Sequence, residues 1–267
     1  MKLERIRYEA CPLCGNAEFA ARGIADCSHH PLYAAPLEPK MTWMGCGLCS
    51  HVFTRGYWSA DAQALIGRKT LPHQSVGHKL EEQRPVSGRI IDRVLACWPP
   101  NPFTEFLCWL DVGFGDAALL LTAKEYGMHP VGVDIRKDNV EAARELGLEA
   151  HCADIAEFKS VAAGLYDIVS LADVLEHVPF PSEALAAVHA HIVTGGLIYI
   201  ATPNRESAIW QLLDRANANP YWAEIEHYHC FSREGLYGLL RQCGFEPVRF
   251  GVSERYRCGM EVIARAV

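Results

Sequence analysis

Short apolar runs alternate with helix-like segments from Phe106 onward, and this alternation restricts the fold more than any other feature of the sequence. The spacing of apolar residues predicts strands over 106–112, 130–135, 148–154, 166–173, 196–203, 245–252 and 260–266. It predicts helices over 116–127, 137–147, 181–193 and 232–244. Repeated alternation of this kind is typical of a parallel α/β sheet with helices on both faces. The last two strands have no helix between them, so we expect the final strand to be antiparallel.

A glycine turn, "LDVGFGDA", follows the first strand over 110–117. Its G-x-G-x-x-A form makes a nicotinamide or flavin dinucleotide the first candidate ligand. Asp111 stands two residues before Gly113, where it would lie close to the pyrophosphate of such a ligand. Like charges about 4 Å apart repel by about 1 kcal/mol even at the dielectric constant of water. Asp111 therefore argues against a pyrophosphate at this turn.

Carboxylates occur in or just beyond four consecutive strand ends, at Asp111, Asp134, Asp154 and Asp173. In an open α/β sheet, ligands bind outside the carboxyl ends of the strands, so these acids are expected to share one site. A ligand with an amino group, a positive centre and a ribose, but no phosphate, would find partners in these carboxylates. S-adenosylmethionine is such a ligand, and two glycines in the turn would let the backbone approach its methionine part.

Individual roles follow from the order of the strand ends. Asp134 comes roughly 20 residues after the glycine turn, where a carboxylate can accept hydrogen bonds from both ribose hydroxyls. Asp154 is expected to accept from the adenine amino group while Ile155 packs on the ring. The expected cofactor site comprises Asp111, Gly113, Gly115, Asp134, Ile135, Asp154, Ile155 and Leu171.

Five motifs in this order resemble those of class I S-adenosylmethionine-dependent methyltransferases: "LDVGFGDA", "GVDI", "ADI", "YDIVSLADVLEHVPFP" and "GGLIYIATPN". The resemblance covers residues 106–267 and is more specific than the glycines alone. It implies a Rossmann-like, seven-stranded sheet with an antiparallel last strand, and transfer of a methyl group to a nucleophilic atom. Asp116 and Ala117 stand where the family often has Thr-Gly. Because alanine is small, we expect cofactor binding to be retained.

Two Cys-x-x-Cys pairs lie near the N-terminus, Cys11 with Cys14 and Cys46 with Cys49. Four thiolates in two such pairs predict a closed, tetrahedral, structural zinc site. Free buried thiols are the alternative, and Cys27, His29, His30 and His51 are possible substitute ligands. The module resembles the zinc-binding N-terminal segment of some bacterial small-molecule methyltransferases, including deoxysugar C-methyltransferases. Zinc ribbons also precede the catalytic domain of some ribosomal RNA methyltransferases.

Two segments could supply a base that takes a proton from the methyl acceptor. Such a base is needed only where the acceptor must lose a proton. The first is "DVLEHVPFP", which places Asp173, Glu176 and His177 beyond the fourth strand. Resemblance to quinone O-methyltransferases, where a similar acid-x-x-Glu-His pattern is associated with a divalent cation, implies Mg²⁺ near these three residues. His177 is the expected base, with a wall residue of the site as the alternative.

The second segment is "WAEIEHYHCFS", over 222–232, in which His227, Tyr228 and His229 precede a helix capped by Ser232. Similar family segments face the acceptor, and histidine titrates near working pH, so either histidine is a plausible base. The alternative is that one of the two is buried and hydrogen-bonded. The expected catalytic residues are His177, Tyr228 and His229. An insert over about 204–230 is expected to form a lid whose Trp210, Tyr221 and Trp222 line the acceptor pocket, although their spacing also fits plain packing.

The expected organisation is a zinc module over 1–58, a helical connector over 59–105 and a methyltransferase domain over 106–267. The formal charge of −7 provides no global attraction for nucleic acid. Eleven cysteines and the lack of a secretory signal or of about 18 consecutive apolar residues indicate a cytoplasmic protein without a membrane span. We expect methyl transfer to the O, N or C atom of a metabolite such as a phenol, quinone precursor or sugar. The alternatives are an RNA methyltransferase that docks through its zinc module and a non-catalytic cofactor-binding or zinc adaptor protein.

Overall fold

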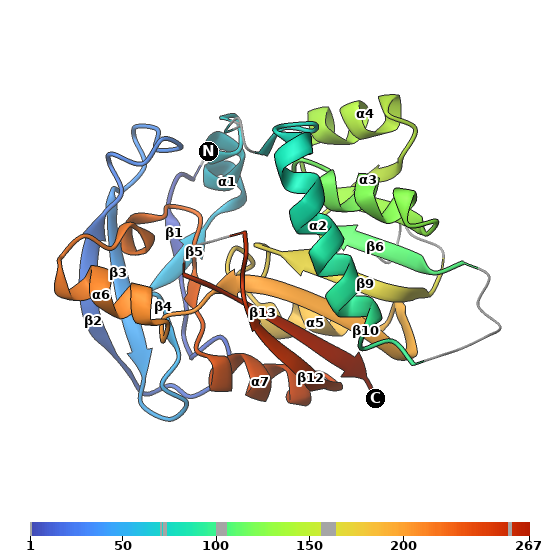
Figure 1. Ribbon diagram of the computed structural model, residues 1–267. Coiled ribbons are helices and arrows are strands. Elements are labelled where there is room, and N and C mark those ends of the chain that lie inside the picture. Colours follow the sequence, from blue (N-terminus) through green and yellow to red (C-terminus); the bar gives the residue numbers. More distant parts are fainter. Residues whose placement is uncertain (1, 70, 72–73, 100–105, 156–163, 256–257) are drawn as a thin grey trace.

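The computed structural model describes residues 2–69, 71, 74–99, 106–155, 164–255 and 258–267. A seven-stranded sheet in the order β12-β13-β10-β9-β6-β7-β8 forms the centre of the protein (Figure 1). Five neighbouring strands are parallel, and β13 is antiparallel to both of its neighbours. The predicted Rossmann-like sheet with an antiparallel last strand is therefore confirmed. The strands are β6 (Cys108–Val112), β7 (His129–Asp134), β8 (Glu149–Cys152), β9 (Tyr166–Ala172), β10 (Ile192–Pro203), β12 (Phe245–Val252) and β13 (Gly259–Ala266).

Helices cover both faces of this sheet (Figure 1). On one face, α2 (Leu80–Leu95) and α3 (Ala118–Glu125) pack through a buried cluster that includes Trp109 of β6 and Tyr199 of β10. Helix α4 (Lys137–Glu145) packs beside α3. On the other face, α5 (Pro181–His189) and α7 (Arg233–Gln242) join a second cluster with Leu110 and Ile198. With both faces covered, the carboxyl ends of the parallel strands are the place left for a ligand.

The helix expected over 181–193 is shorter in the structure, because its last residues belong to the next strand. Helix α5 ends at His189, and Ile192 already pairs with Tyr166 of β9. The β-branched pair Ile192 and Val193 favours a strand. Gly195, with φ of 81°, follows within a register shift of the same strand.

The N-terminal region forms a second, four-stranded sheet in the order β11-β4-β3-β2. Strands β2 (Phe19–Asp26), β3 (Lys40–Cys46) and β4 (Val52–Thr54) come from the first residues of the chain. Strand β11 (His229–Cys230), by contrast, comes from the segment before α7 and pairs antiparallel with β4. A two-stranded ribbon of β1 (Arg5–Arg7) and β5 (Gly56–Trp58) lies beside this sheet. The N-terminal sheet is thus completed by a strand from the C-terminal half.

The segment between β10 and β11 packs on the same sheet. It contains α6 (Ala208–Arg215) and the 3₁₀ helix η3 (Pro220–Ala223). Trp210 of α6 is 2% exposed and joins Trp43, Trp58 and residues of α1 (Ala60–Ile66) in one buried cluster. The N-terminal sheet and the segment after β10 therefore share a hydrophobic core.

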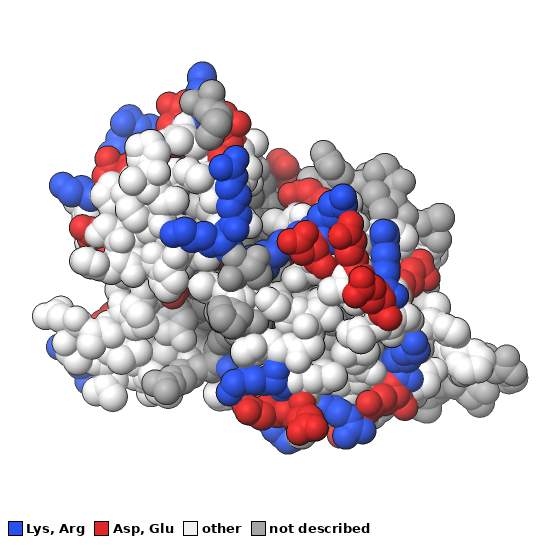
Figure 2. Space-filling model, turned by 90° about the horizontal axis from the view of Figure 1, so that it is seen from above, with Lys and Arg blue, Asp and Glu red and all other residues white. Residues whose placement is uncertain are grey.

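The surface carries both signs of charge. On the face shown in Figure 2, Lys and Arg side chains lie interspersed with Asp and Glu. The chain as a whole has a formal charge of −7. Among the described residues, no helix is long and apolar enough to cross a membrane.

Candidate active site

The glycine turn after β6 has the close-packed backbone that its sequence indicates. Gly113 has φ of 69°, and its N–H donates to the Val133 carbonyl at 2.7 Å. A Cβ atom at this position would lie 2.7 Å from Cγ2 of Val174, which follows β9. Gly115 has φ of 50°. Glycine is therefore required at position 113 both by its left-handed conformation and by the approach of Val174.

We expect Gly113→Ala to weaken cofactor binding at least about tenfold and to destabilise the fold by about 2–3 kcal/mol. The left-handed conformation costs an L-residue about 1–2 kcal/mol, and the stiff Val174 side chain must also move. Gly127→Ala is the matched control, because Gly127 has φ of 80° but open space around its Cβ position. Thermal unfolding and titration with S-adenosylmethionine check both variants. Equal losses in the two would show that the contact with Val174 has no effect.

Asp134 lies at the end of β7, and two backbone N–H groups hold its carboxylate. Oδ2 accepts from Gly115 N at 3.1 Å, and Oδ1 accepts from Arg136 N at 2.8 Å. The residue is 4% exposed, whereas the next residue, Ile135, is 69% exposed. The glycine turn and Asp134 are thus brought into direct contact, as a shared cofactor site requires.

The other expected cofactor residues differ in how far they are exposed. Asp154 is exposed after β8, and Ile155 is buried beside it. Leu171 of β9 is fully buried in the core of the sheet. The structure therefore puts the Asp154 carboxylate at the expected edge of the sheet, while the Leu171 side chain faces the core.

Asn139 contacts the glycine turn, and the sequence analysis did not single it out. Its Nδ2 donates to the Gln74 carbonyl at 2.9 Å and to the Gly115 carbonyl at 3.3 Å. The N–H of Gly77 donates to the Asp116 carbonyl at 2.9 Å, so the connector before α2 lies across the glycine turn. The only signal for this contact in the sequence is an Asn on the inner face of α4. Its hydrogen-bond partners are far away in the sequence.

Asp111 is buried under the turn, 3% exposed, and Oδ1 accepts from Ser170 Oγ at 2.6 Å. Burial raises the pKa of this carboxyl to about 7, against the stabilising hydrogen bond from Ser170. The group titrates near neutrality, so it carries only part of a negative charge there. Its carboxyl is thus a weaker obstacle to an anionic ligand than the sequence suggests.

The raised pKa gives Asp111 a defined effect on stability. The protonated form favours the folded state, so the contribution is fully present below the unfolded pKa near 4 and is lost as the pH rises to about 7. The difference between the pKa values in the folded and unfolded states corresponds to about 4 kcal/mol of folding free energy. We expect Asp111→Asn, which removes this titration, to unfold at a higher temperature than the parent at pH 8 and to lose most of that advantage at pH 4.5. Parallel melting curves across this range would contradict the assignment.

Beyond β9, the structure brings Glu176 and His177 together with His227. One ligand-type atom from each of the three lies within 4.8 Å of the others. The two imidazole rings meet edge to face, with centroids 4.7 Å apart at 82°. Thr202 Oγ1 donates to Oε2 of Glu176 at 3.0 Å, while Oε1 is buried without a partner among the described residues. Asp173, which was expected with Glu176 and His177, is not part of this group.

Burial sets the protonation of this cluster. It raises the pKa of Glu176 well above its usual range and lowers the pKa of both His177 and His227. For His177, the nearby carboxylates of Glu226 and Glu224 act in the opposite direction. Both imidazoles are therefore neutral near pH 7.

His229 and Tyr228 are placed differently from His177. His229 is 1% exposed, with Nδ1 3.1 Å from Nε2 of His51 and Nε2 2.9 Å from the Val178 carbonyl. Burial lowers its pKa to about 4. The hydroxyl of Tyr228 accepts weakly, at 3.4 Å, from the backbone of Trp58. Both side chains lie inside the packed contact between the N-terminal sheet and the half of the protein that carries the seven-stranded sheet.

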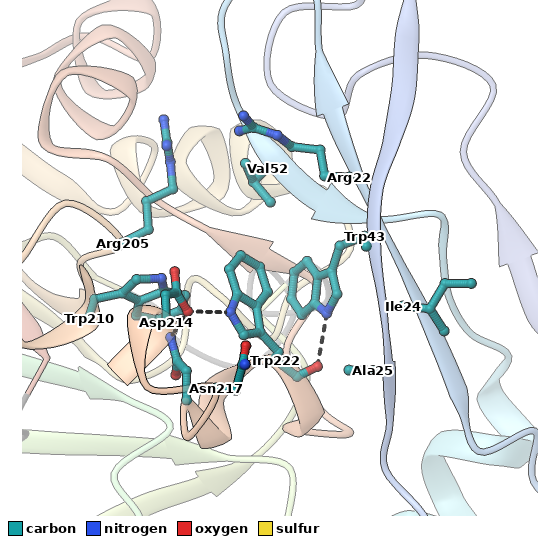
Figure 3. A pocket seen from close by; sticks show the side chains of 12 residues that line it. Arg22, Ile24, Ala25, Trp43, Val52, Arg205, Trp210, Asp214, Asn217 and Trp222 are labelled. Carbon is teal, nitrogen blue, oxygen red and sulfur yellow. Dashed lines mark hydrogen bonds between the residues drawn. The ribbon is translucent and has the colours of Figure 1, made fainter. Parts of the chain in front are cut away.

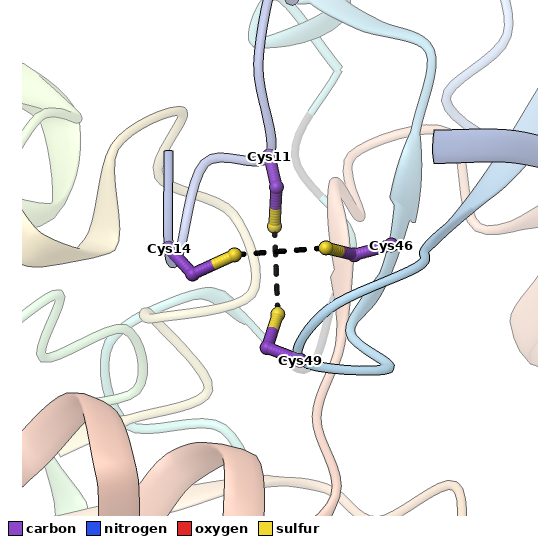
Figure 4. A group of neighbouring side chains, drawn as sticks. All are labelled: Cys11, Cys14, Cys46 and Cys49. Carbon is purple, nitrogen blue, oxygen red and sulfur yellow. Dashed lines mark hydrogen bonds between the residues drawn. The ribbon is translucent and has the colours of Figure 1, made fainter. Parts of the chain in front are cut away.

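The four cysteines of the two pairs converge (Figure 4). The sulfur atoms of Cys11 and Cys49 are 3.7 Å apart, and those of Cys14 and Cys46 are 3.6 Å apart. A tetrahedral site with Zn–S bonds of about 2.3 Å has sulfur atoms about 3.8 Å apart, so the four thiols fit zinc. Burial raises the pKa of Cys46, but hydrogen bonds from the backbone of Cys49 and Leu48 outweigh it and lower the pKa to about 6. At least one thiolate is thus prepared for a metal.

Comparison with known proteins agrees with this geometry. The profile of a methyltransferase domain family matches residues 80–249. The chain belongs to this methyltransferase family. A ubiquinone biosynthesis O-methyltransferase of Bordetella avium is 33% identical over 148 residues, covering 52% of this chain and 61% of the relative. Another, from Nitrosococcus oceani, is 32% identical over 169 residues, covering 57% and 72%. The chain thus spans less than two thirds of the first of these methyltransferases.

Solved structures share the fold of this methyltransferase. The magnesium protoporphyrin IX methyltransferase of Synechocystis, with bound SAH, superposes with a TM-score of 0.55 at 16% identity, covering 69% of this chain and 84% of that one. An S-adenosylmethionine-dependent methyltransferase of Archaeoglobus fulgidus gives a TM-score of 0.53 at 21% identity, covering 68% and 94%. At such identities, the similarity establishes the fold alone.

Proposed function

We propose that this protein transfers a methyl group from S-adenosylmethionine to an oxygen atom of a small aromatic molecule. The contact between the Asp134 carboxylate and the glycine turn carries the proposal, because a carboxylate held at this turn can accept hydrogen bonds from both ribose hydroxyls. The names of the relatives, which are ubiquinone biosynthesis O-methyltransferases, support a phenolic acceptor. The −7 formal charge and the mixed charges in Figure 2 favour a small molecule over RNA.

The residues of the turn fit the cofactor in chemistry and in space. Asp134 would hold the ribose hydroxyls, since both of its oxygens are already oriented by backbone N–H groups. The exposed Ile135 would cover one side of the adenine, and Asp154 would accept from its amino group. When bound here, S-adenosylmethionine would supply the electrophilic methyl group.

The acceptor would lie against the cluster of Glu176, His177 and His227. A neutral imidazole within this cluster would take the phenolic proton. Burial leaves both rings unprotonated, and the carboxylates of Glu226 and Glu224 favour proton uptake by His177. Two imidazoles with one carboxylate are a poor ligand set for Mg²⁺, which prefers oxygen ligands. We therefore assign proton transfer, and no magnesium-dependent step, to these residues.

The remaining parts of the chain would support this site. Zinc held by Cys11, Cys14, Cys46 and Cys49 would be structural, since four thiolates leave no open position. The segment over 204–230 would cover the site as a fixed lid, because it carries His227 to Glu176 and His177. None of the eleven cysteines forms a disulfide, which favours a reducing compartment and a cytoplasmic location.

The test is transfer of labelled methyl groups by the zinc-replete protein. Purified protein is incubated with methyl-labelled S-adenosylmethionine and, in parallel, with a panel of catechols and phenols, a panel of aryl amines, and total RNA. We expect label in the catechol or phenol panel, with the methyl group on oxygen by mass spectrometry. Label only in RNA, or only on nitrogen, would overturn the proposed acceptor class.

A further inference from the structure

A cavity of about 560 Å³ lies between the N-terminal sheet and the segment after β10 (Figure 3). Its walls come from β2, β3 and β4 on one side and from α6, η3 and the residues around them on the other. None of its lining residues belongs to the glycine turn, to the strand-end acids or to the cluster of Glu176, His177 and His227. The volume is in the range of small-molecule sites.

Three indoles give this cavity an aromatic wall. Trp43 and Trp210 are each 2% exposed, and both meet the partly buried Trp222 edge to face with ring centroids 5.2 Å apart. Trp43 Nε1 donates to the Trp222 carbonyl at 2.9 Å, and Trp222 Nε1 donates to Asp214 at 2.7 Å. The exposed Ile24 adds apolar surface on the β2 side. The indoles are therefore fixed in place before any ligand arrives, and Trp222, which is only partly buried, presents apolar ring surface to the cavity.

One end of the cavity is cationic. Arg22 and Arg205 both line it and extend to the same end in Figure 3. Arg205 Nη2 donates to the Ser50 carbonyl at 3.1 Å, which orients its guanidinium. The stem of Arg22 crosses Gly45, where a Cβ atom would lie only 2.6 Å from Cδ of the arginine. Glycine at position 45 thus allows Arg22 to lie over the sheet.

The cavity also contains one carboxylate, Asp214, and neutral side chains donate to one of its oxygens. Asp214 Oδ1 accepts from Trp222 Nε1 and from Asn219 Nδ2, both at 2.7 Å. In Figure 3, Asp214 and Asn217 lie on the side of the Trp222 indole away from Arg22. A ligand would therefore place its anionic group toward the two arginines and its uncharged part along the indoles.

We propose that this cavity is a second small-molecule site, which binds a flat aromatic molecule carrying a carboxylate or a phosphate monoester. Guanidinium groups form charge-assisted hydrogen bonds with either anion, and the partly exposed Trp222 indole packs against the ring. The site does not depend on methyl transfer, because it shares no lining residue with the cofactor turn.

Calorimetric titration of the full-length, zinc-replete protein tests this proposal with three probes: 2-naphthoate, 2-naphthyl phosphate and the uncharged 2-naphthalenemethanol. We expect at least one anion to bind about tenfold or more tightly than the alcohol, which corresponds to one charge-assisted hydrogen bond. The anion that binds more tightly shows whether the site prefers a carboxylate or a phosphate monoester. Saturating S-adenosylhomocysteine is expected to leave this binding unchanged.

Three variants make the test specific. Arg22→Gln together with Arg205→Gln should weaken anion binding at least about tenfold and leave the alcohol unaffected. Trp222→Leu should weaken all three probes. Arg249→Gln, at an exposed arginine of β12, is the matched control and should change nothing. Equal binding of all probes, no binding at millimolar concentration, an unchanged affinity in the double arginine variant, or displacement by S-adenosylhomocysteine would each overturn the proposal.

Discussion

Cys46→Ser is expected to remove zinc from the protein and to lower its melting temperature by about 10 °C. The four sulfur atoms have the spacing of a tetrahedral zinc site, and Cys46 is the thiol most ready to ionise. Structural zinc contributes its binding free energy to folding, so loss of one thiolate should cost about 3–5 kcal/mol. For a chain of this size, such a loss corresponds to a shift of about 10 °C.

Metal content by plasma emission spectrometry and thermal unfolding measure this effect together. Cys97→Ser is the matched control, because Cys97 is a partly buried thiol outside the four-cysteine cluster. The control should keep one zinc per chain and nearly the parental melting temperature. A Cys46→Ser variant that retains zinc and stability would show that the four thiols are merely buried neighbours.

The effect should extend beyond the zinc site. The N-terminal sheet is completed by β11, which begins two residues after His227. Tyr228 N also donates to the Glu176 carbonyl at 2.8 Å. Loss of zinc is therefore expected to disturb the cluster of Glu176, His177 and His227 and to lower methyl transfer as well as stability.

His227→Ala and His177→Ala are expected to lower kcat for methyl transfer, one of them by about 100-fold or more. A general base contributes about 10²–10⁴ to a rate, and these imidazoles are the buried neutral bases of the cluster. Binding of S-adenosylmethionine should remain within about threefold of the parent, because neither residue lies in the glycine turn. Initial rates and cofactor titrations on the same samples separate the two effects.

The controls and the pH profile distinguish a base from a packing residue. His129→Ala, at an exposed histidine that begins β7 on the opposite edge of the sheet, should leave kcat unchanged. The variant that lacks the base should also lose the decline in rate at acidic pH, because that decline reports protonation of the base. Retention of the acidic decline in both His177→Ala and His227→Ala would exclude both as the base.

The sequence was sufficient to predict the main sheet, because each strand has its own apolar run and each turn has its own turn-forming residues. Asp134 and Gly115 were assigned to one site because carboxyl ends of parallel strands meet at one edge, and their hydrogen bond agrees with this. The end of α5 was misplaced because Ile192 fits an apolar helical face as well as a strand. Only pairing with Tyr166 decides between them.

The contacts between distant segments could not be predicted. His227 joins Glu176 and His177 through the fold of a segment whose path is set by β11 pairing with β4. His229 lies against His51 of the N-terminal module, which is 178 residues away in the sequence. The wall formed by Trp43 and Trp222 likewise combines residues from the two halves of the chain. No local pattern reports such tertiary pairings.

The central claim is that the glycine turn and Asp134 hold S-adenosylmethionine, and parallel calorimetric titrations test it most directly. The zinc-replete protein and its Asp134→Asn variant are each titrated with S-adenosylmethionine and with NAD. The account predicts binding of S-adenosylmethionine by the parent, at least about tenfold weaker binding by the variant as one charge-assisted partner is lost, and no binding of NAD. Binding of NAD without binding of S-adenosylmethionine would contradict it and would indicate that the glycine turn binds a dinucleotide.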